Sequence, residues 1–469
     1  MLVPAAAAAA ATLAAALLAG PARAAVTVDT SDKAAVTKAA AATARALMAF
    51  YPPNFRGAIP DVGTSDASGR QWFESGVMWG AFMEHARITG DGQFVPIVTN
   101  ALSNVSYAPS GVGSYLGPST SVASTLLGRW NDDIMWYSLG SLTAAEVFGK
   151  AALMPRSAKI TYLQATVNTY NEVMQQYDES SCNGGVFWSR DRTNPDNKDY
   201  KSTITNAQAI LIAARLSILT GNKTYLTEAD KIYAWLKGTQ IITPTYHVYD
   251  GMSITKCQRH GLEYSYNAGI LIGGMAWMYK ATGNTNYITE AGKLLDTALT
   301  TFATGPVITD LCEGATDMCT VGDATSKPPA ANQVPPKGTM IRGLTYLYMF
   351  TPDAAQKAKI KKFIDASFAG MLSTCTANMG CSAVWTPGAA PANGNFHHQL
   401  VAIELTNAVA AIYLGSSATA DIKNPTSDVT TNVENSQTST TNAAVGVAVV
   451  SSLSTLMIAA VAAATALML

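Results

Sequence analysis

The chain has 469 residues and a formal charge of −1, because 31 lysines and arginines balance 32 aspartates and glutamates. This balance argues against nucleic acid or another strongly charged polymer as partner and suits a neutral ligand. The length allows a large hydrophobic core, and a single domain of this size requires one of the bigger architectures.

The N-terminal segment has the composition of a secretory signal peptide. Residues from Leu2 to Gly20 are almost wholly alanine and leucine, and Ala22-Arg23-Ala24 supplies a small-x-small cleavage site before Ala25. We therefore expect residues 1–24 to be removed on export. No basic residue precedes the apolar run, and an uncleaved membrane anchor is the alternative.

A repeated turn divides the middle of the chain into helical hairpins. Thr-Gly-Asn/Asp, with an aromatic residue five positions after the threonine, occurs at Thr89, Thr220 and Thr282. Further breaks fall near Phe148-Gly149, Phe350-Thr351-Pro352 and Leu414-Gly415-Ser416. Each break follows an apolar helical pattern and precedes an amphipathic one. Six hairpins over residues 25–415 predict an all-α fold, a closed (α/α)6 toroid, with an open solenoid as the alternative.

The inner, more apolar helices should all begin at one mouth of this ring, because every glycine turn lies at the opposite end. Polar and aromatic residues gather at these starts. They include Trp72 to Trp79, Trp130 to Asp133, Thr203 to Asn206, Tyr264 to Asn267, Lys337 to Arg342 and Phe396 to His398.

The cysteines and sequons agree with export. Six cysteines suit an oxidising compartment. Close spacing favours pairing Cys312 with Cys319 and Cys375 with Cys381, which leaves Cys182 with Cys257, although other pairings are open. Zinc is the alternative, but no C-x-x-C spacing occurs. Two sequons predict N-glycosylation at Asn104 and Asn222.

The C-terminal segment has the layout of a GPI signal. A Ser/Thr/Asn-rich linker, residues 416–442, leads to small residues and then to a charge-free apolar tail from Leu456 to Leu469. Asn442 is the expected attachment residue, with Asn435 or Ser439 as alternatives, and residues 443–469 would be removed. The tail is short for a spanning helix, which is the competing interpretation.

Asp132 and Asp133 are the candidate catalytic residues. Hydrolysis of a glycosidic bond needs one carboxyl group to protonate the leaving oxygen and a second to attack or to activate water. The helix N-terminus favours ionised Asp132, and this charge should raise the pKa of Asp133. A helix cap or a solvated face is the alternative, but the neighbouring Trp130 and Trp136 argue against a solvated face.

The run from Arg129 to Trp136 resembles the signature of glycoside hydrolase family 76, the endo-α-1,6-mannanases and their fungal GPI-anchored relatives. Glu74 to Gly80, Gly184 to Trp188, Tyr266 to Gly269, and Lys337-Gly338 with Arg342 support the resemblance, which covers roughly Asp32 to Gly415. It implies an (α/α)6 fold, a retaining mechanism without metal or cofactor, Asp132 as nucleophile and Asp133 as acid/base. Ala268 departs from the pattern, because many relatives carry glutamine there.

Several rim residues are candidates for substrate binding, each with an alternative explanation. Asp250 resembles a sugar-contacting acid of the family but also fits an Asp-Gly turn. Lys337 and Arg342 could be solvated charges, Asn267 a helix cap and Trp188 a core residue. His397-His398 lacks a metal-ligand spacing, and no metal is expected. The full candidate set is Trp79, Trp130, Asn131, Trp136, Trp188, Asn206, Asp250, Tyr266, Asn267, Lys337 and Arg342.

These features predict a retaining endo-α-1,6-mannosidase, secreted and GPI-anchored at the outer face of the plasma membrane or in the cell wall. Its expected partners are α-1,6-mannan or a GPI glycan, wall polysaccharide and, through the lipid, the membrane. A transglycosidase that links GPI-anchored glycoproteins to wall glucan would use the same residues. A non-catalytic glycan-binding wall protein is the third possibility.

Overall fold

A computed structural model describes residues 26–51, 57, 72–116, 130–193, 198–310, 313, 337–387, 389, 396–415 and 422–425. The compact unit of the chain extends to Asn424, which is beyond the expected boundary at Gly415. The predicted signal peptide and the predicted GPI attachment site lie outside the described residues.

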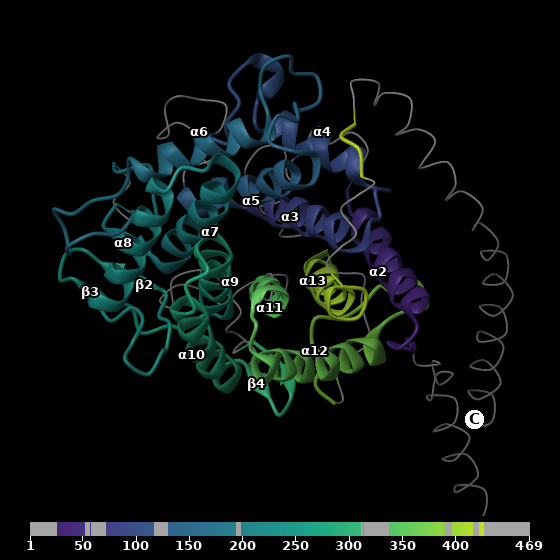
Figure 1. The fold of residues 1–469 in the computed structure, drawn as a ribbon. Helices are drawn as coiled ribbons and strands as arrows, with labels where there is room; N and C mark the ends of the chain where they lie inside the picture. The colour runs from purple at the N-terminus through teal and green to yellow at the C-terminus, as the bar shows by residue number, and fades with distance from the viewer. Residues whose placement is uncertain are drawn as a thin grey trace, which may run out of the picture. The chain divides into compact units, whose positions relative to one another are not determined.

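Six inner helices stand side by side in a ring, which Figure 1 shows from one end. Their N-termini lie at the starts expected from the sequence, so the predicted helical toroid is confirmed. Residues Thr203–Thr220 are long and apolar enough to cross a membrane, yet they form a buried wall of the ring. The inner helices are α3 (Trp72–Thr89), α5 (Asn131–Phe148), α7 (Thr203–Thr220), α9 (Ser265–Thr282), α11 (Lys337–Phe350) and α13 (Phe396–Tyr413).

Outer helices cover the ring, and five of them follow their inner partners in the chain. The sixth hairpin differs from the expectation, because the outer helix that packs on α13 is α2 from the N-terminal end. The ring is therefore closed by two helices that are distant in sequence. The outer helices are α2 (Lys33–Met48), α4 (Val95–Val105), α6 (Tyr162–Met174), α8 (Thr224–Gly238), α10 (Asn286–Thr301) and α12 (Ala354–Thr374), and a short 3-10 helix follows α4 at Ala108–Ser110.

The Thr-Gly-Asn/Asp repeat is a helix stop. At Thr220, the hydroxyl donates to the Leu216 carbonyl at 2.7 Å and accepts from the Asn222 amide at 3.2 Å. Gly221 between them has φ +76°, the left-handed conformation that favours glycine. The same two hydrogen bonds occur at Thr89 and at Thr282, which explains why the motif recurs at the ends of inner helices.

Close packing between inner helices depends on glycine. A Cβ on Gly269 would lie 2.2 Å from the Met340 Cα, and one on Gly343 would lie 1.8 Å from the Gly269 carbonyl oxygen. Helices α9 and α11 therefore touch backbone to backbone. A larger residue at either position would force the helices apart.

A buried layer of charged side chains crosses the ring below the mouth. Glu84 on α3 accepts hydrogen bonds from Arg87, from the Thr143 hydroxyl at 2.9 Å and from the Tyr346 hydroxyl at 2.8 Å. Arg215 on α7 pairs with Glu146 at 2.8 Å. Although burial opposes ionisation, the guanidinium groups lower the pKa of Glu84 to about 2, so this carboxylate is charged and paired.

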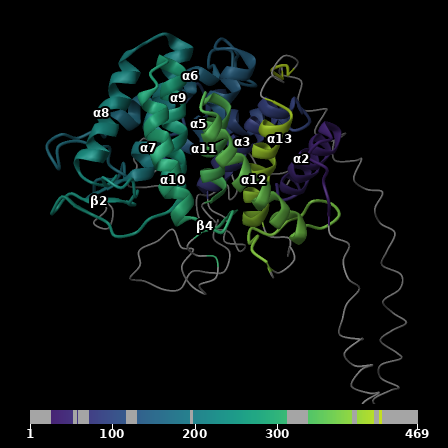
Figure 2. The ribbon, with the colours of Figure 1, turned by 60° about the horizontal axis from the view of Figure 1, so that its bottom comes forward.

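Short strands gather at the mouth, where the outer helices end and the inner helices begin. Strand β1 (Tyr200–Ser202) pairs antiparallel with β2 (Gly251–Ser253), and β2 pairs with β3 (Gln258–Arg259). A second ribbon joins β4 (Ala303–Thr304) to β5 (Val307–Ile308). In Figure 2, β2 and β4 lie toward the same end of the helices.

Two of the three expected disulfides are present. Cys182 joins Cys257, which ties the loop after α6 to the β2–β3 hairpin, and Cys375 joins Cys381. Cys312 and Cys319 lie outside the described residues. Of the two sequon asparagines, Asn222 is exposed in the turn between α7 and α8, and Asn104 is half-buried near the end of α4.

Candidate active site

Asp132 and Asp133 occupy the first turn of α5, as expected. The backbone before this turn is extended and pairs with a second segment, because Trp130 forms a β-bridge with Ser189. The Asn131 amide donates to the Trp188 carbonyl at 2.9 Å, and its side-chain amide donates to the Phe187 carbonyl at 2.7 Å. The aspartate pair is therefore held in a fixed relation to the segment that carries Trp188.

Asp250 joins this site through the small sheet. The Trp188 amide donates to the Tyr200 carbonyl at 2.9 Å, and Tyr200 begins the strand that pairs with β2, directly after Asp250. The carboxylate of Asp250 accepts hydrogen bonds from the Tyr200 hydroxyl at 2.6 Å, the Tyr266 hydroxyl at 3.2 Å and the Asn267 amide at 3.2 Å. These three donors fix Asp250 close enough to Asp132 for its charge to raise the pKa of Asp132.

Aromatic rings surround the carboxyl groups. Trp130 lies 5.7 Å from Trp188, measured between ring centroids, and Trp188 meets Tyr200 edge to face at 6.0 Å. Tyr264 stacks on Tyr266 at 5.6 Å. All five residues keep part of their surface exposed. Such amphipathic rings suit a ligand with alternating apolar faces and hydroxyl groups.

The electrostatics of the pair differ in part from the expectation. Burial, with the charge of Asp250 as a smaller contribution, raises the pKa of Asp132 to about 7. Burial and the charge of Asp132 raise the pKa of Asp133 well above its usual value. The charge of Asp132 acts on Asp133 in the predicted direction. The α5 N-terminus does not keep Asp132 in the ordinary range, because burial outweighs it.

The site offers hydrogen-bond acceptors that the described residues do not use. The buried Oδ1 atoms of Asn131, Asp132 and Asn267 have no hydrogen-bond partner among these residues. A buried polar atom of this kind costs free energy unless something binds it. These three oxygens are therefore available to water or to the hydroxyl groups of a ligand.

Two predicted binding residues, Trp79 and Asn206, lie deeper than the sequence suggests. Trp79 is fully buried, its indole donates to the Gly57 carbonyl, and its ring packs edge-on against Tyr51. Asn206 is also fully buried and bonds to both the amide and the carbonyl of Val186. The Asn206 side chain supports the segment that carries Trp188, and the Trp79 indole is bonded to Gly57, so we do not include either residue among the proposed ligand contacts.

Lys337 and Arg342 differ most from the expected rim charges. Lys337 is fully buried, pairs with Glu313 and lies 3.6 Å from the centroid of the Trp385 ring. Arg342, 3% exposed, pairs with Glu404 on the neighbouring α13. Both cations neutralise carboxylates inside the protein, so neither is placed to meet a ligand hydroxyl. Trp136 is likewise buried, at 4% exposure.

His397, at the start of α13, faces the protein interior, and His398 is half-buried. His397 lies against Glu74, with 3.1 Å between His Nε2 and the carboxylate. Over the described ranges, no group of three His, Cys, Asp or Glu side chains is arranged to hold a metal ion.

Sequence reasoning missed Tyr200 and Tyr264. Tyr200 links Trp188 to Asp250, and Tyr264 extends the stacked pair at the start of α9. Tyr200 stands in a polar stretch with no periodic pattern, so only the pairing of β1 with β2 shows its role. Tyr264 could have been found, because it precedes an inner helix in the same way as Trp130.

The fold and the site together define a helical-toroid protein with paired carboxyl groups at its mouth, an arrangement that glycoside hydrolases use. The comparison with known families is decisive, since residues 35–421 match the profile of glycosyl hydrolase family 76. The chain belongs to this family.

Curated relatives come from fungi. The chain is 29% identical over 299 residues to the mannan endo-1,6-alpha-mannosidase DCW1 of Saccharomyces cerevisiae, covering 62% of each chain. It is 25% identical over 395 residues to DCW1 of Eremothecium gossypii, covering 81% of this chain and 80% of that one. The match thus spans less than two thirds of the Saccharomyces relative.

Solved structures share the fold. Dfg5 from Chaetomium thermophilum, in complex with glucosamine, superposes with a TM-score of 0.68 at 24% identity, covering 86% of this chain and 95% of that one. An α-1,6-mannanase of Salegentibacter, GH76A, superposes with a TM-score of 0.62 at 17% identity, covering 80% and 99%. That structure is an inactive variant with two consecutive aspartates changed to asparagine, bound to α-1,6-mannotriose.

Proposed function

We propose that this protein is a retaining endo-α-1,6-mannosidase in which Asp132 is the nucleophile and Asp133 the acid/base. The observation that carries the proposal is the pair of adjacent, half-buried carboxyl groups at the mouth, both of whose pKa values are raised by desolvation. Because the charge of one carboxylate opposes ionisation of its neighbour, the pair favours one ionised and one protonated carboxyl group, the two states that the reaction needs.

The comparisons support the substrate. The curated relatives are named for cleavage of 1,6-linked α-mannan. The Salegentibacter neighbour binds an α-1,6-mannotriose after the loss of two consecutive aspartates. Asp132 and Asp133 are two consecutive aspartates in the same fold, so we carry both the substrate and the catalytic pair to this chain.

The mechanism follows from the protonation states. Asp133 donates its proton to the glycosidic oxygen as the carboxylate of Asp132 attacks the anomeric carbon, so the leaving sugar departs as an alcohol and a glycosyl ester forms on Asp132. Asp133, now ionised, removes a proton from water, which attacks the same carbon and releases Asp132. Two inversions at one carbon give net retention.

The aromatic rings and Asp250 position the sugar. Trp130, Trp188 and Tyr266 present apolar faces next to the carboxyl pair. Asp250 provides oxygen atoms for hydroxyl groups of the ligand and is itself held by the two tyrosine hydroxyls described above and by the Asn267 amide. We propose Trp130, Trp188, Tyr266 and Asp250 as the substrate contacts, whereas Asn131 and Asn267 are fully buried and hold these residues in position.

We further propose that the protein is secreted and held at the outer surface by a GPI lipid. The support is the sequence of the two ends, together with the disulfides of a chain folded in an oxidising compartment. A tethered position suits action on wall mannan.

Product analysis tests the proposed function. The secreted protein is incubated with α-1,6-mannohexaose, and the products are separated by size while NMR follows the anomeric configuration. We expect shorter α-1,6-oligosaccharides whose new reducing ends first appear as the α-anomer. Initial release of the β-anomer, or no cleavage, would contradict the proposal. Adding a β-glucan acceptor distinguishes transfer, which would yield a larger mixed product. The names of the curated relatives favour hydrolysis.

A further inference from the structure

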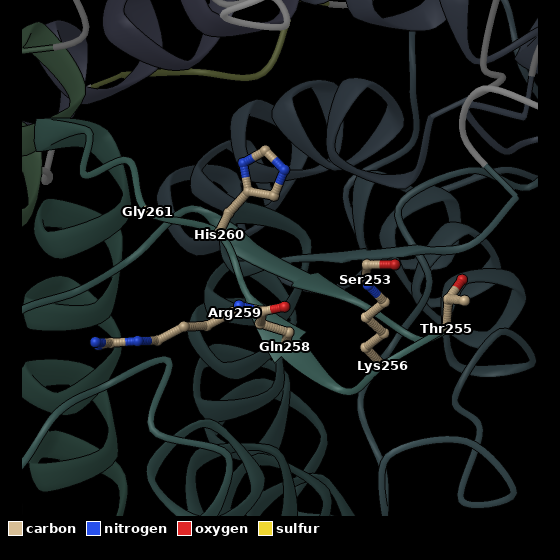
Figure 3. A pocket seen from close by; sticks show the side chains of 7 residues that line it. All are labelled: Ser253, Thr255, Lys256, Gln258, Arg259, His260 and Gly261. Carbon is tan, nitrogen blue, oxygen red and sulfur yellow. The ribbon is translucent and has the colours of Figure 1, made fainter.

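A cavity lies on the β2–β3 hairpin, beside the proposed active site. It measures about 300 Å³ and is formed by residues of β2, β3 and the turn between them. Figure 3 shows these side chains, with Lys256 near Ser253 and His260 on the opposite side of the hairpin. None of the proposed catalytic residues lines it.

The chemistry of this cavity differs from that of the mouth. Two cationic side chains, Lys256 and Arg259, line it together with the polar groups of Ser253, Thr255 and Gln258, and none of its lining residues is acidic. Lys256 is exposed and makes no ion pair with the described residues. The guanidinium of Arg259 extends away from Lys256 (Figure 3), lies 4.0 Å from the Tyr249 ring centroid and donates to the Gln240 carbonyl at 3.5 Å. The unneutralised positive charge of the cavity is therefore that of Lys256.

The hairpin is held in place before any ligand binds. Cys257 next to Lys256 is bonded to Cys182, and the His260 amide donates to the Gly251 carbonyl at 2.7 Å. A site fixed in this way loses less conformational entropy on binding.

One side chain separates the cavity from the mouth. The ring of His260, which lines the cavity, meets the ring of Tyr200 edge to face at 5.5 Å. Tyr200 in turn donates to Asp250 at 2.6 Å. A saccharide bound along the aromatic rings at the mouth can therefore extend into the cavity with its next residues.

We propose that this cavity is a subsite for a phosphate ester carried by the saccharide that is cleaved at the mouth. A neutral mannan leaves Lys256 unpaired, whereas a phosphate group offers several oxygens to its ammonium group and to the neighbouring hydroxyls of Ser253 and Thr255. The inference rests on the proposed function and adds a substrate preference to it. Phosphorylated α-1,6-mannosides are then better substrates than neutral ones.

The test compares two substrates of equal length, α-1,6-mannotetraose and the same tetraose with a terminal mannose 6-phosphate. The measured quantity is the ratio of their kcat/KM values. We expect the wild-type ratio to favour the phosphorylated substrate by about 5-fold, as for one exposed ion pair. Lys256→Ala should bring the ratio close to one, and Lys256→Arg should restore most of it. The matched control is Lys223→Ala, an exposed lysine at the start of α8, which should keep the wild-type ratio.

A wild-type ratio of one or less, or the same preference in Lys256→Ala, would overturn the subsite. Calorimetric titration with mannose 6-phosphate and with inorganic phosphate measures binding without catalysis. It distinguishes a site for a phosphorylated saccharide from a site for free phosphate. Tighter binding of mannose 6-phosphate than of inorganic phosphate, lost in Lys256→Ala, supports a saccharide subsite. Equal binding of both ligands overturns it. If neither substrate is cleaved, the proposed function fails, while the titration still decides the subsite.

Discussion

Replacing Asp132 by asparagine should abolish turnover and at the same time stabilise the fold above neutral pH. Asparagine matches aspartate in size but cannot ionise, so the change removes only the charge. Burial raises the pKa of Asp132 from 3.8 to about 7, so the folded chain keeps a proton that the unfolded chain has released. Wild-type stability therefore falls as pH rises through this interval, and the variant is spared that loss.

The magnitude follows from the shift. A rise from 3.8 to about 7 corresponds to ~4 kcal/mol of free energy of unfolding lost at pH 8. Asp132 keeps part of its surface at solvent and titrates together with Asp133, so we take about half, ~2 kcal/mol, as the expected gain for Asp132→Asn. At pH 4 the carboxyl group is protonated in the folded chain and only partly ionised in the unfolded chain, so the gain should shrink to about 0.5 kcal/mol or less.

Urea denaturation followed by tryptophan fluorescence at pH 4 and pH 8 measures this difference. The matched control is Asp296→Asn, because Asp296 is an exposed partner of Lys359 and should change stability by less than about 1 kcal/mol at either pH. The reasoning is wrong if Asp132→Asn is no more stable than the wild type at pH 8. The reasoning is also wrong if Asp132→Asn is stabilised as much at pH 4 as at pH 8. A gain that is independent of pH would come from packing and not from ionisation.

Four further outcomes are expected. The kcat/KM for α-1,6-mannan should fall about tenfold per pH unit below pH 7 as Asp132 gains its proton. Asp250→Asn should move this acid side of the pH profile to lower pH, because it removes a charge that raises the pKa of Asp132. An unchanged profile would contradict the electrostatic effect of Asp250 on Asp132. The activity of Asp133→Ala on mannan should be lower than that of the wild type by about 10²-fold or more. Substrates with a good leaving group should still glycosylate this variant, and azide should rescue its turnover with retained configuration. Near-normal activity of the folded variant would refute the assignment. Glu84→Gln should cost about 3–5 kcal/mol in urea denaturation because buried arginines lose their partner, and a cost below about 1 kcal/mol would show the pair to be dispensable. Phospholipase treatment of protoplasts should release the protein, whereas detection of residues 456–469 in the mature chain by mass spectrometry would exclude the lipid anchor.

Local signals predicted most of the ring. The stop at Thr220-Gly221-Asn222 is specified within three residues, because the threonine hydroxyl and the glycine conformation end the helix without help from the rest of the fold. The closure of the ring by α2 could not be predicted in this way. It depends on packing between α2 and α13, whose residues stand at opposite ends of the chain.

The sequence predicts site residues that are adjacent in the chain. It does not predict those whose role depends on partners distant in the sequence. The pair Asp132-Asp133 with Trp130 is contiguous. Arg342 stands in the second turn of α11, so the sequence suggested a rim cation. Its partner Glu404 is 62 residues away, on a neighbouring helix, and only the tertiary structure shows that the guanidinium points inward.

Two groups of buried carboxyl groups in the same ring show what marks the candidate site. In the layer below the mouth, Glu84 meets Arg87 and Arg215, and these cations hold its pKa at about 2 against the effect of burial. At the mouth, Asp132 and Asp133 are half-buried, no lysine or arginine among the described residues pairs with them, and their pKa values rise. An ionised carboxylate without a cation lowers stability, so a fold has a physical reason to avoid it unless the charge is used. The lack of a cation partner therefore distinguishes the mouth carboxyls from Glu84 in the charged layer below.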